Sequence, residues 1–281
     1  MTHAARFRIG ELSRRVGVSP ELLRAWETRY GLLVPERTPG GLRLYSEDDE
    51  RCVREMSRQI AAGLSAAEAA RVVLAAALPF VPAHRLVDQL DVALTALDEP
   101  SAQVALDQAF AARDLEAALA QVILPFLRDL GERWAATQRT VAQEHFASNV
   151  IGGKLRALAR GWGDGDGPCV LLACPAGEQH ELGLICFGLL LRKRGWSIAY
   201  FGAQTPAADL ATAISELSPE LVVFSATSAQ QFVDAADDIR SLGELARLAI
   251  GGPGASLALA RSLGAELLPP DLVAAADVKR P

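Results

Sequence analysis

Glu178, His180 and Gly183 form a Glu-x-His-x-x-Gly motif directly after a predicted buried strand. A histidine in such a loop can offer a neutral imidazole nitrogen to a metal, and a nearby carboxylate can fix which ring nitrogen carries the proton. Glu178 is the candidate for that orienting role. Gly183 would let a bound group approach the following helix without a side chain in the way. A lone loop histidine is more often structural, so the motif alone leaves both interpretations open.

Small and hydroxyl-bearing residues also follow the next three predicted strands. In parallel α/β sheets, ligands bind beyond the carboxyl ends of the strands, so these loops are candidate walls of a site. A buried ligand would need small residues and hydroxyl donors there. The candidates are Gly202 and Thr205, Ser225 and Thr227, and Gly251 and Gly252.

Strands that alternate with helices position these loops. Short apolar runs at 170–173, 197–201, 221–224 and 248–250 are typical of buried strands, and helical segments lie between them. The alternation predicts a Rossmann-like, doubly wound parallel sheet in a domain spanning 166–281.

A helical segment precedes the sheet. Residues 83–162 are rich in Ala and Leu with helical periodicity, which predicts a four-helix bundle in a domain spanning 79–165. The third helix is predicted over 114–134. The fourth begins at Thr140, where Gln143 completes a capping box.

Trp134 closes the third predicted bundle helix, and Glu144 and His145 lie in the first turns of the fourth. A short connection should bring the three residues together, where they could cover the upper face of a ligand. The alternative is a tryptophan in the bundle core and a solvated helix start.

The first part of the chain, residues 1–78, has the pattern of a winged helix-turn-helix. Two short helices are predicted between residues 8 and 30, and the second opens with Ser19 as N-cap followed by a proline. Arg24 and Thr28 project away from the apolar face of that second helix. An arginine fork matches both guanine edges and phosphates, so this row suits a DNA groove.

A predicted hairpin follows, because Pro39-Gly40-Gly41 separates two short runs of alternating residues. Capping boxes at Ser46 with Asp49 and at Ser65 with Glu68 open two further helices. The segment 23–45 resembles the DNA-binding domain of the MerR family. The resemblance implies that Arg24 and Thr28 face DNA, and that Arg37, Arg43 and Tyr45 contact phosphates at the wing.

The motif at 178–183 resembles the cobalamin-binding signature of methionine synthase and the mutases. The spacing of Trp134 to Glu144 and His145 resembles the light-responsive CarH/LitR regulators. These resemblances imply that His180 is the lower cobalt ligand, that Trp134 packs on the adenosyl group, and that the strand-end loops hold the nucleotide tail. The implied cofactor is adenosylcobalamin, with methylcobalamin or another cobalamin as the alternative.

The sequence departs from these families at two places. Light-sensing relatives have a histidine after the tryptophan, which becomes the upper cobalt ligand after photolysis, whereas this chain has Ala135. His145 is the histidine placed to substitute for it. The cobalamin family usually has Ser-x-Leu at the third strand end, whereas Thr227 is polar here.

Composition sets limits on the class of protein. The net charge of −6 excludes a globally basic nucleic-acid coat, although arginines outnumber acidic residues in residues 1–46 and can form a local basic surface. The four cysteines lack the spacing of a zinc site and are too sparse for a disulfide framework. Neither a signal peptide nor a membrane span is predicted, and we expect a cytoplasmic protein.

Together these features predict a multidomain α and α/β transcription regulator that is not an enzyme. We expect a repressor that binds double-stranded promoter DNA, forms a homo-oligomer (dimer or tetramer) and responds to cobalamin and to light. One alternative is a corrinoid methyl carrier of a methyltransferase system. The other is a MerR-type regulator that no longer uses cobalamin and senses a protein partner.

Overall fold

The computed structural model describes residues 7–38, 41–77, 81–135, 140–164 and 166–278, with only the backbone described at 75–77 and 132–135. The chain divides into two compact units, Met1–Asp114 and Leu115–Pro281, here called the amino-terminal and carboxy-terminal units. This division falls inside the segment predicted as a four-helix bundle.

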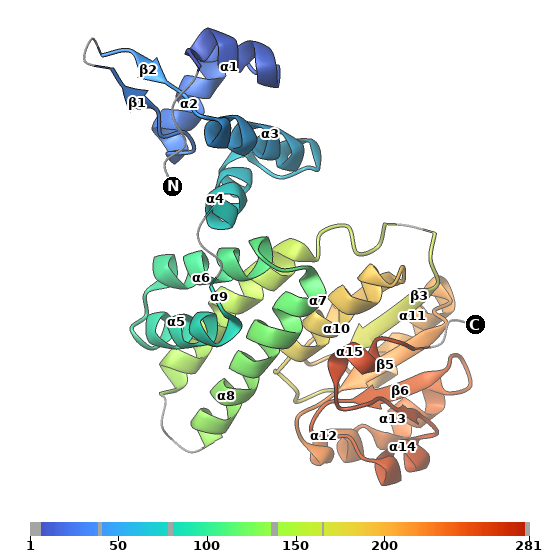
Figure 1. Cartoon of the computed structure of the whole chain (residues 1–281). Helices are drawn as coiled ribbons and strands as arrows, with labels where there is room; N and C mark the ends of the chain where they lie inside the picture. The colour runs from blue at the N-terminus through green and yellow to red at the C-terminus, as the bar shows by residue number, and fades with distance from the viewer. Residues whose placement is uncertain (1–6, 39–40, 78–80, 136–139, 165, 279–281) are drawn as a thin grey trace. The chain divides into compact units, whose positions relative to one another are not determined.

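The amino-terminal unit begins with the predicted helix-turn-helix (Figure 1). Gly17 ends the first helix in a left-handed conformation (φ 70°), and the Ser19 side chain accepts a hydrogen bond from the Leu22 backbone to open the second. The predicted capping boxes at Ser46 and Ser65 are confirmed. The helices are α1 (Ile9–Val16), α2 (Pro20–Tyr30), α3 (Glu47–Ala61), α4 (Ala66–Ala77), α5 (Ala83–Thr95) and α6 (Glu99–Ala111).

The predicted wing is an antiparallel hairpin of β1 (Glu36–Arg37) and β2 (Arg43–Leu44). Thr38 donates its backbone N–H to the Leu42 carbonyl and accepts the Leu42 N–H on its hydroxyl. Residues 39–40 of the predicted turn lie outside the described residues. The Thr38 bonds therefore extend the pairing of β1 and β2 by one position beyond the strands.

Helices α1 to α4 pack around a core that includes Leu12, Leu23, Trp26 and Met56. Leu22 on α2 is 45% exposed, so the apolar face of this helix is narrower than its sequence indicates.

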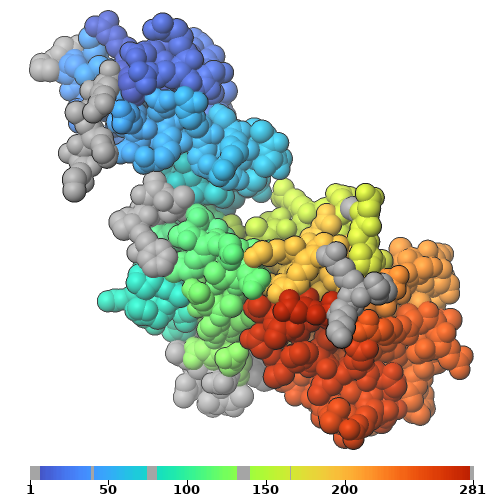
Figure 2. All heavy atoms as spheres, turned by 45° about the vertical axis from the view of Figure 1, so that its right-hand side comes forward, coloured from blue at the N-terminus to red at the C-terminus, as the bar shows by residue number. Residues whose placement is uncertain are grey.

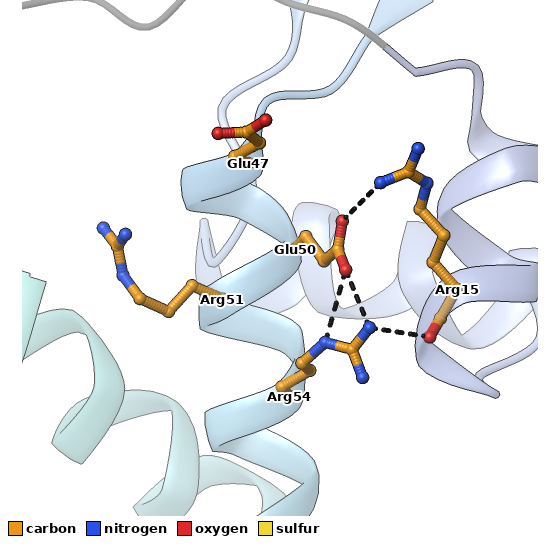
Figure 3. Close-up of a pocket in the computed structure, with 5 residues that line it drawn as sticks. All are labelled: Arg15, Glu47, Glu50, Arg51 and Arg54. Carbon is orange, nitrogen blue, oxygen red and sulfur yellow. Dashed lines mark hydrogen bonds and ion pairs between the residues drawn. The ribbon is translucent and has the colours of Figure 1, made fainter.

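An ion network braces α1 against α3 (Figure 3). Glu50 accepts hydrogen bonds from Arg15, at 3.2 Å, and from Arg54, at 2.7 Å, and Arg54 also donates to the Arg15 carbonyl. With Glu47 and Arg51 these residues line a surface hollow of about 370 Å³. Glu50 already pairs with two arginines, so we interpret the charged residues of this hollow as holding α1 to α3.

The carboxy-terminal unit begins with helices that match the prediction. The third predicted bundle helix is continuous through α7 (Leu115–Ala118), η1 (Leu119–Ile123) and α8 (Leu124–Ala135), and η1 is a π-helical turn. The π turn lies just before Pro125, whose missing N–H interrupts regular helix bonding. Then α9 (Val141–Leu158) opens with the predicted Thr140–Gln143 capping box.

A five-stranded parallel sheet in the order β4-β3-β5-β6-β7 forms the rest of this unit. The doubly wound sheet is confirmed, and the two-residue edge strand β7 was not predicted. The strands are β3 (Cys169–Ala173), β4 (Ser197–Gly202), β5 (Leu221–Ser225), β6 (Leu248–Gly251) and β7 (Glu266–Leu267). The helices between and after them are α10 (Leu182–Lys193), η2 (Ala207–Asp209), α11 (Leu210–Leu217), α12 (Ala229–Asp234), α13 (Ala236–Leu242), α14 (Leu257–Leu263) and α15 (Leu272–Ala275).

The strand order places the site. Chain connections leave in opposite directions from β3 and β5, and ligands bind beyond the carboxyl ends of the strands at such a switch point in folds of this kind. The apolar helix α10 packs on β3 and β4 on one side and on α9 on the other (Figure 1). In Figure 2 the yellow and gold surfaces of these neighbouring parts of the chain lie side by side. Within the described parts of the chain, no helix is both long and apolar enough to cross a bilayer.

Candidate functional site

Glu178 and His180 lie in the loop after β3, with opposite exposures. The Glu178 side chain is fully buried, whereas the His180 side chain is 60% exposed. Glu178 Oε1 accepts the His180 backbone N–H at 2.7 Å and contacts His180 Nδ1 at 2.6 Å. Because Nδ1–H donates to this carboxylate, Nε2 is the ring nitrogen left to bind a metal.

Thr227, in the loop after β5, holds the other oxygen of Glu178. Its backbone N–H lies 2.5 Å and its hydroxyl 2.7 Å from Glu178 Oε2. The polar residue that departs from the family pattern therefore completes the hydrogen bonding of a buried carboxylate. Sequence reasoning assigned Thr227 to the nucleotide tail and missed this contact, because the two residues are 49 positions apart.

These hydrogen bonds decide the charge of Glu178. Burial would raise the pKa of this carboxyl, but the donors from Thr227 and His180 outweigh burial and lower its pKa. Glu178 is therefore an ionised acceptor near neutral pH, suited to fixing the imidazole of His180.

The other predicted strand-end residues gather at the same edge of the sheet. The Thr205 N–H donates to the Cys174 carbonyl, and the Cys174 N–H donates to the Gly202 carbonyl, which joins the loops after β3 and β4. Ser225 ends β5 opposite Gly251, which ends β6. The sheet thus brings these loops together as predicted.

The glycines at this edge serve different purposes. Gly252 has φ 89°, and a Cβ there would lie 2.5 Å from the Ala226 carbonyl oxygen, so the loop itself requires glycine. A Cβ on Gly183 would meet no heavy atom within 4 Å. The start of α10 is therefore open to a bulky group, as the sequence motif indicates.

The predicted upper-face residues are described only in part. Glu144 and His145 lie in the first turns of α9, as predicted. His145 is 68% exposed with Nε2 3.5 Å from Glu144 Oε2, and the Ser148 hydroxyl donates to Glu144 Oε1 at 2.8 Å. The backbone of Trp134 is in the last turn of α8, but its side chain lies outside the described residues.

The candidate DNA surface is on α2 and the wing. Arg24 and Thr28 are exposed on α2, and Arg37 and Arg43 are exposed on the hairpin strands. Arg43 Nε donates to Glu27 Oε1 at 2.9 Å, so this wing strand is tied to α2.

Tyr45 corrects the expectation that it contacts phosphates. Its side chain is 0% exposed and packs in the core of the amino-terminal unit. Its hydroxyl donates to Glu27 Oε2 at 2.9 Å, and burial together with Glu27 raises the pKa of Tyr45 to about 12. Tyr45 therefore holds the wing to α2 from inside.

Glu27 was missed by sequence reasoning, although a signal for it exists. Residues two apart on a strand point to the same side, so Arg43 and Tyr45 were both able to reach one acceptor. The carboxylate of Glu27 is that acceptor, with Arg43 on one oxygen and Tyr45 on the other.

The donor set at His180 favours a metal that arrives with its own ligands. Among the described residues, no group of three His, Cys, Asp or Glu side chains converges as a metal site. One histidine held at Nδ1 by a buried carboxylate, beside an open helix start, would suit one bond to a metal whose other ligands come from a macrocycle.

Family models match nearly the whole chain. The model described as "MerR HTH family regulatory protein" matches residues 7–76. Two models described as "B12 binding domain" match residues 86–159 and 168–276.

Two curated relatives from Myxococcus xanthus match most of the chain. "HTH-type transcriptional repressor CarH" is 34% identical over 250 residues, 84% of each chain. "HTH-type transcriptional repressor CarA" is 35% identical over 268 residues, covering 92% of this chain and 91% of the relative. The chain belongs to the CarH/CarA family. It is a B12-binding, MerR-type transcriptional repressor, and the corrinoid methyl-carrier alternative is set aside because this is a family of regulators, not enzymes.

A solved structure shares the fold of about two thirds of this CarH/CarA family member. It is the monomethylamine corrinoid protein of Methanosarcina barkeri, with a TM-score of 0.60 and 16% identity, covering 69% of this chain and 97% of that one. At this identity the likeness shows the fold alone.

We expect Thr227→Val to loosen the sheet edge, because Glu178 loses a hydroxyl donor and keeps its burial. The opening free energy of the β3 and β5 amides should fall by about 2 kcal/mol, measured by hydrogen exchange of the chain without cofactor. Thr205→Val is the matched control, since the Thr205 hydroxyl contacts only carbonyls at 3.3 and 3.4 Å. Equal exchange in the two variants would contradict the role of Thr227.

Proposed function

We propose that this repressor is controlled by adenosylcobalamin, with Nε2 of His180 as the lower ligand of cobalt. The observation that carries the proposal is the pairing of exposed His180 with buried Glu178. Glu178 holds the proton on Nδ1, and Thr227 holds Glu178. The side chains thus aim one nitrogen out of the sheet edge.

The walls of the site follow from the strand ends. We assign the nucleotide tail to the loops beyond the carboxyl ends of β3 and β5, next to the start of α10, where a Cβ on Gly183 would meet open space. The walls of the site are Gly202, Thr205, Ser225, Thr227, Gly251 and Gly252. Methylcobalamin or another cobalamin remains the alternative cofactor for the same walls.

The upper face is assigned to Trp134, Glu144 and His145. Adenosylcobalamin supplies a cobalt–carbon bond that light can break, which is chemistry of the cofactor. Because Ala135 has no ligating atom, a protein ligand on the upper face after illumination would come from His145, which is exposed and held only loosely by Glu144.

DNA binding is assigned to residues on α2 and the wing. Arg24 and Thr28 read base edges, Arg37 and Arg43 contact phosphates, and Glu27 with Tyr45 sets the wing against α2. A homo-oligomer, dimer or tetramer, links several of these DNA-binding domains. Linking them raises the occupancy of the operator through effective concentration, without new base contacts.

The domain organisation we propose is 1–78 for DNA binding, 79–165 for the helical cap and 166–281 for the cobalamin-binding sheet. Each of the three matching family models falls within one of these spans, which supports the division.

We expect His180→Ala to change the visible spectrum of the chain reconstituted with adenosylcobalamin in the dark, because cobalt loses its protein lower ligand. His84→Ala removes an exposed histidine on α5 and should leave the spectrum as in the wild type. Identical spectra for wild type and His180→Ala would contradict the assignment of His180 as the lower ligand.

We expect Arg24→Ala to weaken binding to the operator by about tenfold to a hundredfold, because a base contact is lost. Arg37→Ala should weaken binding to all sequences alike and lower the salt dependence by about one phosphate contact. Arg71→Ala, exposed on α4, is the control. Mobility-shift titrations at several salt concentrations measure all three, and equal affinities for Arg24→Ala and Arg71→Ala would contradict the assigned recognition face.

We expect adenosylcobalamin to produce a larger species in the dark and illumination to change its size, because the ligand must favour one assembly state over another. Size-exclusion chromatography, dark against illuminated, measures this with His180→Ala as the variant that should not respond. An unchanged elution position under every condition would remove the switch.

A further inference from the structure

Glu181 follows His180 in sequence and makes a separate set of contacts. Its side chain is 17% exposed, and Oε1 accepts a hydrogen bond from Arg156 of α9. Oε2 accepts the Tyr200 hydroxyl of β4 at 2.7 Å and the Ala203 backbone N–H at 3.1 Å. One carboxylate therefore joins α9, β4 and the loop after β4.

The backbone on both sides makes room for this carboxylate and its partner. A Cβ on Gly202, which has φ 78°, would lie 2.7 Å from Glu181 Oε2. On α9, a Cβ on Gly152 would lie 2.8 Å from Arg156 Nη1 and 3.2 Å from Leu182 Cδ2. Helix α9 thus approaches the start of α10 closely where Arg156 reaches Glu181.

The spacing along α9 connects this contact to the predicted upper face. His145, Gly152 and Arg156 are seven and four residues apart, so they share one side of the helix. At a rise of about 1.5 Å per residue, His145 and Arg156 are roughly 16 Å apart along the axis. One face of α9 therefore carries the proposed upper-face histidine near its start and the partner of Glu181 near its end.

We propose that Glu181 is a positioning residue that couples α9 to the His180 loop, so that a shift of the cobalt ligand moves the helix that covers the upper face. The proposal rests on the proposed function, because it takes His180 as that ligand. His180 and Glu181 are consecutive residues, so the loop cannot move one without displacing the anchor of the other. An exposed ion pair alone would transmit little, but this carboxylate accepts three hydrogen bonds and is largely shielded from water.

Tyr200 keeps its side of the contact as a donor. Burial and the nearby Glu181 carboxylate raise the pKa of Tyr200, so its hydroxyl stays protonated. We call the contacts of Glu181 with Arg156, Tyr200 and Ala203 the joint. The contacts with Tyr200 and Ala203 fix Glu181 to the sheet, whereas the contact with exposed Arg156 is the one that can break.

The joint itself is tested in the full chain without cofactor by hydrogen exchange of Glu181→Gln. We expect exchange of residues 152–158 and 203–205 to become several-fold faster, because the amide keeps the shape and loses the charge that holds Arg156. Glu266→Gln is the matched control. Glu266 lies on β7, the edge strand farthest from β4, and the variant breaks its ion pair with Arg247. Equal exchange of α9 in the two variants would overturn the proposal.

Coupling to the cofactor is tested by titrating adenosylcobalamin in the dark. We expect the Kd to rise about threefold to tenfold in both Glu181→Gln and Arg156→Gln, with the spectrum at saturation unchanged because His180 is intact. An unchanged Kd in both variants would overturn the coupling. A wild-type chain that binds no adenosylcobalamin would overturn the proposed function and the cofactor arm of this proposal with it, whereas the exchange result reports on the joint alone.

Discussion

The buried carboxylate of Glu178 is the constraint on which the carboxy-terminal unit depends. A charge taken out of water is costly unless it is fully hydrogen-bonded. Glu178 meets this requirement with donors from its own loop at His180 and from the loop after β5 at Thr227. The cost of leaving the buried carboxylate without these donors locks the two loops together. The exposed imidazole is thereby held in one tautomer at the edge of the sheet.

The sheet order makes this arrangement possible. Strand β3 pairs with β4 on one side and β5 on the other, so the loops after all three strands end at one edge. Glu178 uses the β5 side through Thr227, and its neighbour Glu181 uses the β4 side through Tyr200. Two acidic residues three positions apart therefore serve different structures, one orienting His180 and the other reaching α9.

The amino-terminal unit applies the same physical rule to a different task. Glu27 on α2 accepts hydrogen bonds from Arg43 and Tyr45, which fixes the wing against the helix proposed to read DNA. In both units a carboxylate on or beside a rigid element holds a side chain of the proposed binding surface. Such contacts behind the binding surface reduce the conformational freedom of the side chains that meet the ligand.

Local sequence determined most of the elements and where the candidate site residues lie along them. Capping boxes at Ser46, Ser65 and Thr140, the wing strands and the alternation of strands and helices are set by neighbouring residues, so they can be predicted without knowledge of the fold. Tertiary structure alone decided which partners these residues meet. Three contacts show this: Tyr45 with Glu27, Thr227 with Glu178, and Glu181 with Arg156. The residues of each pair are at least 18 positions apart in sequence. Local pattern alone does not identify such pairs, because they form only when the packing of the wing on α2, the strand order and the packing of α9 on α10 bring the chain segments together.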